Sequence, residues 1–185
     1  MRMERISQIT IPGDGIALDG ILGLPEQPKG VIAFAHGSGS GRFSPRNQFV
    51  ARVLETGGFA TLLLDLLTPD EADDRSKVFD IDLLADRLLL AQGWLQSHAH
   101  TKNLRAGYFG ASTGAGAALQ AAAREPDAVG AVVSRGGRPD LAGPVMAVLA
   151  ILWHELAILA TLALITVLTW NTVNQVALGT FTLLW

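Results

Sequence analysis

A glycine-flanked serine, in the stretch Gly110-Ala-Ser112-Thr-Gly114, is the strongest candidate for chemistry in this sequence. An apolar run over 106–109 predicts a buried strand before it, and an alanine-rich segment predicts a helix after it. Such a tight turn strains the serine backbone and presents its hydroxyl at a helix N-terminus, where developing negative charge is favoured. The serine could therefore attack a carbonyl, although a glycine-rich strand-to-helix turn of any α/β protein has the same pattern.

A second glycine-rich stretch, His36-Gly-Ser-Gly-Ser-Gly41, follows the apolar run over 31–35. Its glycines let backbone N–H groups approach a ligand closely. With Asp65 at the end of the next apolar run, this stretch also imitates a dinucleotide-binding site. Its spacing is Gly-x-Gly-x-Gly rather than Gly-x-Gly-x-x-Gly, and two strands precede it, so a dinucleotide-binding protein is kept only as an alternative function.

The elements that position these residues follow from hydrophobic periodicity. Two apolar stretches around Pro12-Gly13-Asp14-Gly15 predict an antiparallel hairpin. Alternating strands and helices after it predict a mostly parallel sheet with helices on both faces, which binds ligands at the carboxyl ends of its strands. The predicted strands are 6–11, 16–24, 31–35, 59–67, 106–109 and 128–134, the predicted helices are 47–56, 80–97 and the segment after Ser112, and 68–77 is predicted to be a surface loop.

The composition limits the class of protein. The chain has 185 residues and a formal net charge of −3, which fits one domain and provides no basic surface for nucleic acid. It has no cysteine, and its four histidines lack metal-site spacing, so we expect neither a disulfide framework nor a metal. Its first residues contain no apolar signal run, so a cytoplasmic location is expected.

On these motifs, residues 6–144 resemble the α/β-hydrolase superfamily and, within it, the dienelactone-hydrolase-like branch. The resemblance implies an α/β fold with a mostly parallel sheet. The sheet begins with the N-terminal hairpin and is truncated at its C-terminal side. The stretches that carry it are Phe34-Ala-His36-Gly-Ser-Gly-Ser-Gly41 with Arg42-Phe-Ser-Pro-Arg46, Leu62-Leu-Leu-Asp65, Gly107-Tyr-Phe-Gly-Ala-Ser-Thr-Gly114 and Val132-Val-Ser-Arg-Gly-Gly-Arg-Pro-Asp140.

The resemblance also implies catalytic roles. Ser112 is the nucleophile, and the oxyanion hole is formed by the backbone N–H of Thr113 and that of Gly37 or Ser38. The implied activity is hydrolysis of a small ester or lactone through an acyl-enzyme, without a cofactor.

The sequence departs from the superfamily at the catalytic acid and base. In this superfamily an Asp or Glu and then a His follow the serine in chain order, but the strands expected to carry them are not recognisable beyond residue 144. His154, on an apolar stretch, and Asp140, in a turn, are weak candidates; His36 suits a structural role in the oxyanion loop, and His98 and His100 are expected to be solvated. Because a serine without a base is a poor nucleophile, a catalytically impaired or non-catalytic hydrolase remnant is the other alternative.

The last part of the chain, 145–185, differs from the hydrolase-like domain, 1–144. From residue 141 onward the only ionisable side chains are His154 and Glu155. As a helix, 145–170 would be about 39 Å long, enough to cross a bilayer core of about 30 Å, although Glu155 would be costly there. Three interpretations are open: a membrane anchor, apolar helices or strands buried at the missing sheet edge, or unrelated sequence joined to a truncated hydrolase.

Overall fold

The computed structural model describes residues 5–137 and shows a sheet of six strands in the order β1-β2-β4-β3-β5-β6. Strands β1 and β2 form the antiparallel hairpin, β2 pairs antiparallel with β4, and the other neighbours are parallel. The predicted α/β fold with a mostly parallel sheet and an N-terminal hairpin is confirmed. The strands are β1 (Arg5–Gly13), β2 (Ile16–Leu24), β3 (Val31–Ala35), β4 (Ala60–Leu64), β5 (Ala106–Ala111) and β6 (Val129–Arg135).

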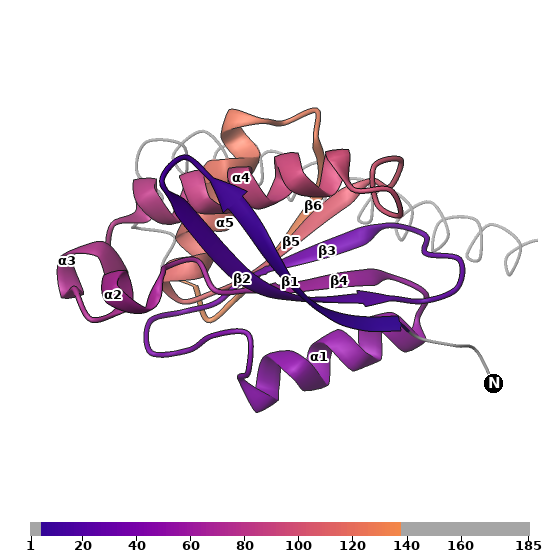
Figure 1. The fold of residues 1–185 in the computed structure, drawn as a ribbon, viewed down its shortest axis with the longest axis horizontal. Helices are drawn as coiled ribbons and strands as arrows, with labels where there is room; N and C mark the ends of the chain where they lie inside the picture. Colours follow the sequence, from indigo (N-terminus) through magenta and orange to yellow (C-terminus); the bar gives the residue numbers. More distant parts are fainter. Residues whose placement is uncertain (1–4, 138–185) are drawn as a thin grey trace, which may run out of the picture. The chain divides into compact units, whose positions relative to one another are not determined.

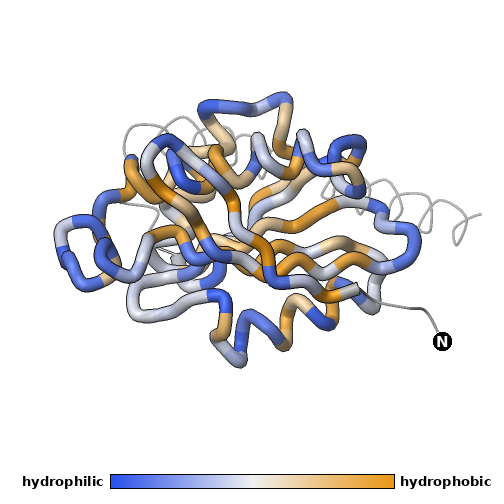
Figure 2. The backbone as a smooth tube through the Cα atoms, viewed as in Figure 1, coloured by the Kyte–Doolittle hydropathy of each residue, from blue (hydrophilic) through white to orange (hydrophobic). Residues whose placement is uncertain are grey.

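Helices cover both faces of this sheet (Figure 1). Helix α1 (Pro45–Thr56) packs on one face, around Phe34, Ala51 and Leu63. Helices α4 (Ile81–Ser97) and α5 (Thr113–Arg124) pack together on the other face, over the larger of the two apolar clusters. The hydrophobic colouring is concentrated on the strands, whereas α1 alternates between polar and apolar residues (Figure 2). The continuous apolar runs of β3 and β4 are thus explained by burial on both faces.

The segment after β4 differs from the prediction. The strand predicted over 59–67 ends at Leu64, and in place of the predicted surface loop 68–77 the chain forms two short helices, α2 (Pro69–Ala72) and α3 (Arg75–Val78). The first of them begins with a capping box, in which the Thr68 hydroxyl accepts from the N–H of Glu71 and the Glu71 carboxylate accepts from the N–H of Thr68. The pattern Thr68-Pro-Asp-Glu71 is a helix-start signal in the sequence, so this element could have been predicted.

Glu71 also joins α2 to α4. Its carboxylate lies 3.0 Å from the guanidinium of Arg87, and Lys77 lies 3.6 Å away. Burial opposes the charged form, but the hydrogen bond from Thr68 and the positive charges of Arg87 and Lys77 outweigh it, so the pKa of Glu71 is lowered. The folded structure therefore favours the ionised carboxylate.

Within residues 5–137, every helix is too short or too polar to cross a bilayer. The apolar segment 145–170, together with its candidate residue His154, lies outside the described residues. The expected domain boundary at 144/145 and the cytoplasmic location stay predictions.

Candidate active site

Ser112 sits at the turn from β5 to α5 in the strained backbone conformation that the sequence predicts. It has φ 51° and ψ −121° and, between residues 5 and 137, is the only non-glycine residue with a positive φ. Although Ser112 is the N-cap of α5, its hydroxyl makes no capping hydrogen bond. The side chain is therefore presented at the carboxyl edge of the sheet without a structural task of its own.

The two glycines of the motif allow strand and helix to approach closely. A Cβ on Gly114 would lie 2.1 Å from the carbonyl oxygen of Ala35 and 2.4 Å from that of His36. A Cβ on Gly110 would lie 2.5 Å from the Cα of Ala115. All three distances are shorter than real Cβ contacts, so only glycine fits at either position.

The loop after β3 contacts the serine turn. A Cβ on Gly37 would lie 2.9 Å from the Cβ of Ser112, so the backbone of Gly37 passes directly beside the serine. Gly37, Ser38 and Ser112 line the same cavity of about 580 Å³, which the guanidinium-bearing residues Arg46 and Arg135 also border. Among the described residues, no backbone carbonyl accepts the N–H of Gly37 or Ser38. The structure thus places the predicted nucleophile, Ser112, beside the loop residues predicted to supply one of the two oxyanion donors.

Thr113 follows Ser112 as the first residue of α5 and is 2% exposed. It lines a second cavity of about 320 Å³, which shares Gly37, Ser38 and Ser40 with the first. Apolar side chains from β2, the segment after β4 and the helices α2 to α4 line part of this second cavity: Ala17, Leu67, Ala72, Val78 and Leu84. The polar residues Asp19, Arg42, Asp65 and Thr68 also border it. The loop after β3 therefore separates a polar cavity at Ser112 from a more apolar one at Thr113.

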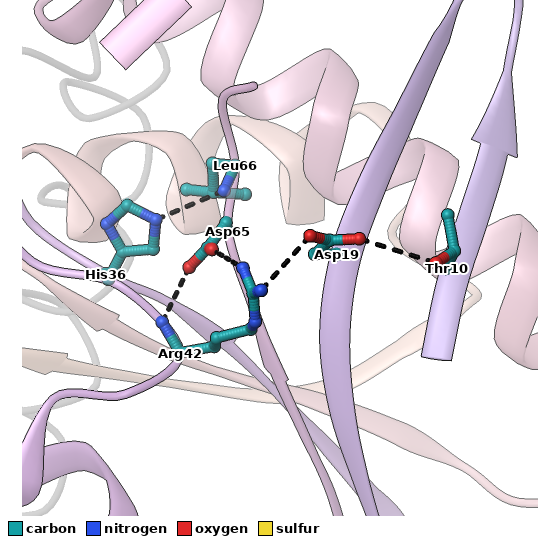
Figure 3. A network of polar contacts seen from close by, with 6 residues as sticks. All are labelled: Thr10, Asp19, His36, Arg42, Asp65 and Leu66. Atoms are coloured by element: carbon teal, nitrogen blue, oxygen red, sulfur yellow. Dashed lines mark hydrogen bonds and ion pairs between the residues drawn. The ribbon is translucent and has the colours of Figure 1, made fainter. Parts of the chain in front are cut away.

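His36 has a structural role in this loop. Its Nε2 accepts the N–H of Leu66 at 3.1 Å, and its Nδ1 lies 3.0 Å from the carbonyl oxygen of Gly37 (Figure 3). Since Nε2 is an acceptor, the ring proton belongs on Nδ1, from which it is donated to Gly37. Both ring nitrogens are thereby engaged with the backbone, and neither is left to take a proton from Ser112.

Asp65 is engaged with Arg42. One carboxylate oxygen accepts the backbone N–H of Arg42 at 2.6 Å, and the other accepts from its guanidinium. The same guanidinium reaches Asp19 on β2 at 3.1 Å, so Arg42 lies between two carboxylates (Figure 3). The dinucleotide-binding interpretation needs a free acidic residue here to bind a ribose, and the Asp65 carboxylate is already occupied.

The other candidate bases lie elsewhere. His98 and His100 follow α4, in the segment that leads into the start of β5, whereas Ser112 follows the end of β5. His98 is half-buried rather than solvated, because its ring stacks on Trp94 at 4.6 Å. Burial lowers the pKa of His98, and the nearby charge of His100 lowers it further. Asp140 and His154 lie outside the described residues.

In residues 5–137, no three His, Cys, Asp or Glu side chains are grouped to hold a metal ion.

The sequence did not predict the role of Arg42, because its partner Asp65 is 23 residues away. The only available signal was its place at the end of the glycine-rich stretch.

Comparison with solved structures finds α/β-hydrolases. A dienelactone hydrolase from Anabaena variabilis is 51% identical, with a TM-score of 0.73, and the match covers 77% of this chain and 68% of that one. A dienelactone hydrolase-like phosphotriesterase from metagenomic libraries has a TM-score of 0.60 at 17% identity, covering 72% of this chain and 59% of its own. At that identity the second likeness concerns the fold alone.

Comparison with curated proteins finds a longer relative. A "Putative phosphoribosyl transferase" of Mycobacterium tuberculosis is 57% identical over 139 residues, which are 75% of this chain and 31% of that protein. This chain thus spans about a third of the length of the curated relatives it matches. A family profile described as "Protein of unknown function (DUF3623)" matches residues 140–185, beginning close to the expected boundary at 144/145.

Proposed function

This chain belongs to the dienelactone-hydrolase-like branch of the α/β-hydrolases, and we propose that it hydrolyses small esters or lactones through an acyl-enzyme on Ser112. The observation that carries the proposal is the conformation of Ser112, at φ 51° beside the backbone of Gly37. A non-glycine residue in that region costs about 1–3 kcal/mol, and such strain is concentrated at functional sites. The Ser112 hydroxyl makes no capping hydrogen bond that would offset this cost, so its use in catalysis explains the strain.

In the proposed reaction the Oγ of Ser112 attacks the carbonyl carbon while its proton passes to a base. The carbonyl oxygen becomes an oxyanion that accepts from the N–H of Thr113 and from that of Gly37 or Ser38. Collapse of this intermediate expels the alcohol, which takes up the proton, and leaves an ester on Ser112. Water then attacks that ester by the same route and releases the acid and the free serine.

The two cavities fit the two parts of such a substrate. Both are bordered by the loop that supplies an oxyanion donor, so a carbonyl held by that loop would lie at their boundary. We propose that the apolar cavity beside Thr113 holds the less polar part of the substrate and that the cavity at Ser112 holds the more polar part.

The base is the incomplete part of this proposal. His36 uses both ring nitrogens in the loop, and His98 and His100 lie in the segment that leads into the start of β5, whereas Ser112 follows its end. His154 is the one histidine of the sequence outside the described residues, and Asp140 is the matching acid candidate. A base could also come from a partner chain. The alternative function, a hydrolase remnant without catalysis, applies if none of these groups reaches Ser112.

The experiment is labelling of the intact chain with a fluorophosphonate, which reacts only with an activated serine. The control variant is Ser112→Ala, which keeps the Cβ and removes the nucleophile. We expect wild type to be labelled and the variant not. A folded wild-type protein that stays unlabelled would show instead that the chain is a hydrolase remnant without catalysis.

His154→Ala is the second variant. If His154 is the base, labelling should fall about as far as in a serine enzyme that has lost its histidine, by a factor on the order of 10⁶. Labelling that persists in His154→Ala would show that His154 is not the base.

A further inference from the structure

We propose that Asp65 and Arg42 are positioning residues, which hold the loop 36–42 so that its N–H groups point at the oxyanion. This inference rests on the proposed function, because it assigns those N–H groups a role in the reaction. In the structure both ends of the loop are attached to two consecutive residues, Asp65 and Leu66, directly after β4 (Figure 3).

The far end of the loop is held by Asp65. Its carboxylate accepts two groups of Arg42, the backbone N–H at 2.6 Å and the guanidinium. The side chains of Arg42 and Asp65 are only 19% and 25% exposed, so this charge-assisted pair is partly shielded from water. A Cβ on Gly41 would lie 2.7 Å from Asp65 Oδ1, so the carboxylate lies directly against the backbone of the loop.

The near end of the loop is held by the neighbouring residue. The backbone N–H of Leu66 donates to His36 Nε2 at 3.1 Å, and the His36 ring donates in turn to the carbonyl oxygen of Gly37. Between the two attachments the loop folds on itself, since the N–H of Ser40 donates to the carbonyl oxygen of Gly37 at 3.2 Å. The candidate donors Gly37 and Ser38 therefore lie in a short span that is fixed at both ends.

The contact with Asp19 is the weaker part of this network. The Asp19 side chain is 51% exposed, and its oxygen lies 3.1 Å from the Arg42 guanidinium. Exposed ion pairs add little to stability. Asp65 alone binds both the backbone and the side chain of Arg42, so we assign the positioning to Asp65.

The attachment of the loop to Asp65 should affect the rate of the proposed reaction. An oxyanion donor acts mainly in the transition state, so a displaced loop lowers kcat more than it changes substrate binding. The test variant is Asp65→Asn, whose amide retains one acceptor for the N–H of Arg42 but turns a donor toward its guanidinium. We expect kcat for p-nitrophenyl acetate and the rate of fluorophosphonate labelling to fall about 10- to 100-fold, with KM within about twofold.

The matched control is Asp86→Asn. Asp86 also forms an ion pair with an arginine, Arg124 at 2.6 Å, but this pair links α4 to the C-terminal end of α5, and its hydrogen bonds within the described part of the chain join only these two helices. Amide hydrogen exchange of the peptide covering 36–42 provides a readout that does not depend on activity. It should accelerate in Asp65→Asn and stay at the wild-type rate in Asp86→Asn.

The outcomes separate the two proposals. Faster exchange in the loop with slower labelling supports the positioning role. Unchanged exchange in a folded Asp65→Asn protein overturns it, as does an unchanged labelling rate. If wild type itself is not labelled, the proposed function fails, and exchange alone decides whether Asp65 holds the loop. Should Asp65→Asn not fold, Arg42→Lys, which keeps the charge and loses the paired N–H groups, is measured in the same way.

Discussion

Replacing Ser112 by glycine should make the protein more stable while it abolishes the reactive hydroxyl. At φ 51° and ψ −121° a side chain with a Cβ is strained, whereas glycine is not. Relief of the strain is worth about 1–3 kcal/mol, and the larger backbone entropy of glycine in the unfolded chain costs about 0.5–1 kcal/mol. The difference is a stabilisation of about 1 kcal/mol.

Ser112→Ala is the reference for this prediction. Alanine retains the Cβ and therefore the strain, and it loses no capping bond, because the Ser112 hydroxyl makes none. Both variants lose the nucleophile, so any difference in stability between them reports the backbone alone. Urea unfolding, followed by circular dichroism, gives the midpoint and the slope m for each.

We expect Ser112→Gly to have the higher urea midpoint at equal m, and a melting temperature about 2–4 °C higher for each kcal/mol gained. Equal stability of the two variants, or a less stable glycine variant, would show that the turn is not strained. It would also remove the physical reason for assigning catalysis to Ser112.

Two further predictions concern the surroundings of the site. Gly114→Ala would place a methyl group 2.1 Å from the backbone oxygen of Ala35, which cannot move aside as a side chain can. We expect the free energy of unfolding in urea to fall by about 3 kcal/mol and the labelling of Ser112 to become slower. A variant as stable as wild type would contradict the close approach of α5 to β3. Glu71→Gln should cost about 1.5–3 kcal/mol at pH 7, typical of hydrogen bonds to a charged group. Because the folded pKa of Glu71 is lowered, wild type should lose its extra stability over Glu71→Gln as the pH falls below the usual glutamate pKa of about 4.3 and through the lower folded value. A difference in unfolding free energy between the two proteins that stayed constant down to pH 2 would refute the stabilising role of the ionised Glu71 carboxylate.

Much of the fold could be predicted from the sequence. The strands β2 and β3 have the predicted bounds, and α4 begins one residue later than predicted, after its cap Asp80. These elements carry local signals: apolar runs or helical periodicity, ended by proline, glycine or a capping side chain. The differences lie between Asp65 and Lys77, where β4 ends before its apolar run does and a capping box begins α2.

In the candidate site, too, only the features with a local signal could be predicted. The serine turn could be predicted from the sequence, because the Gly-x-Ser-x-Gly spacing between an apolar run and an alanine-rich segment is a local signal. The sequence did not show which groups Asp65, Arg42 and His36 bind, and Asp65 after the glycine-rich stretch also fitted a dinucleotide site. These contacts follow from the tertiary structure, since Arg42 meets Asp65 across 23 residues and His36 meets Leu66 across 30. Contacts between residues so far apart depend on the pairing of β3 with β4 in the sheet, and no local spacing in the sequence records that pairing.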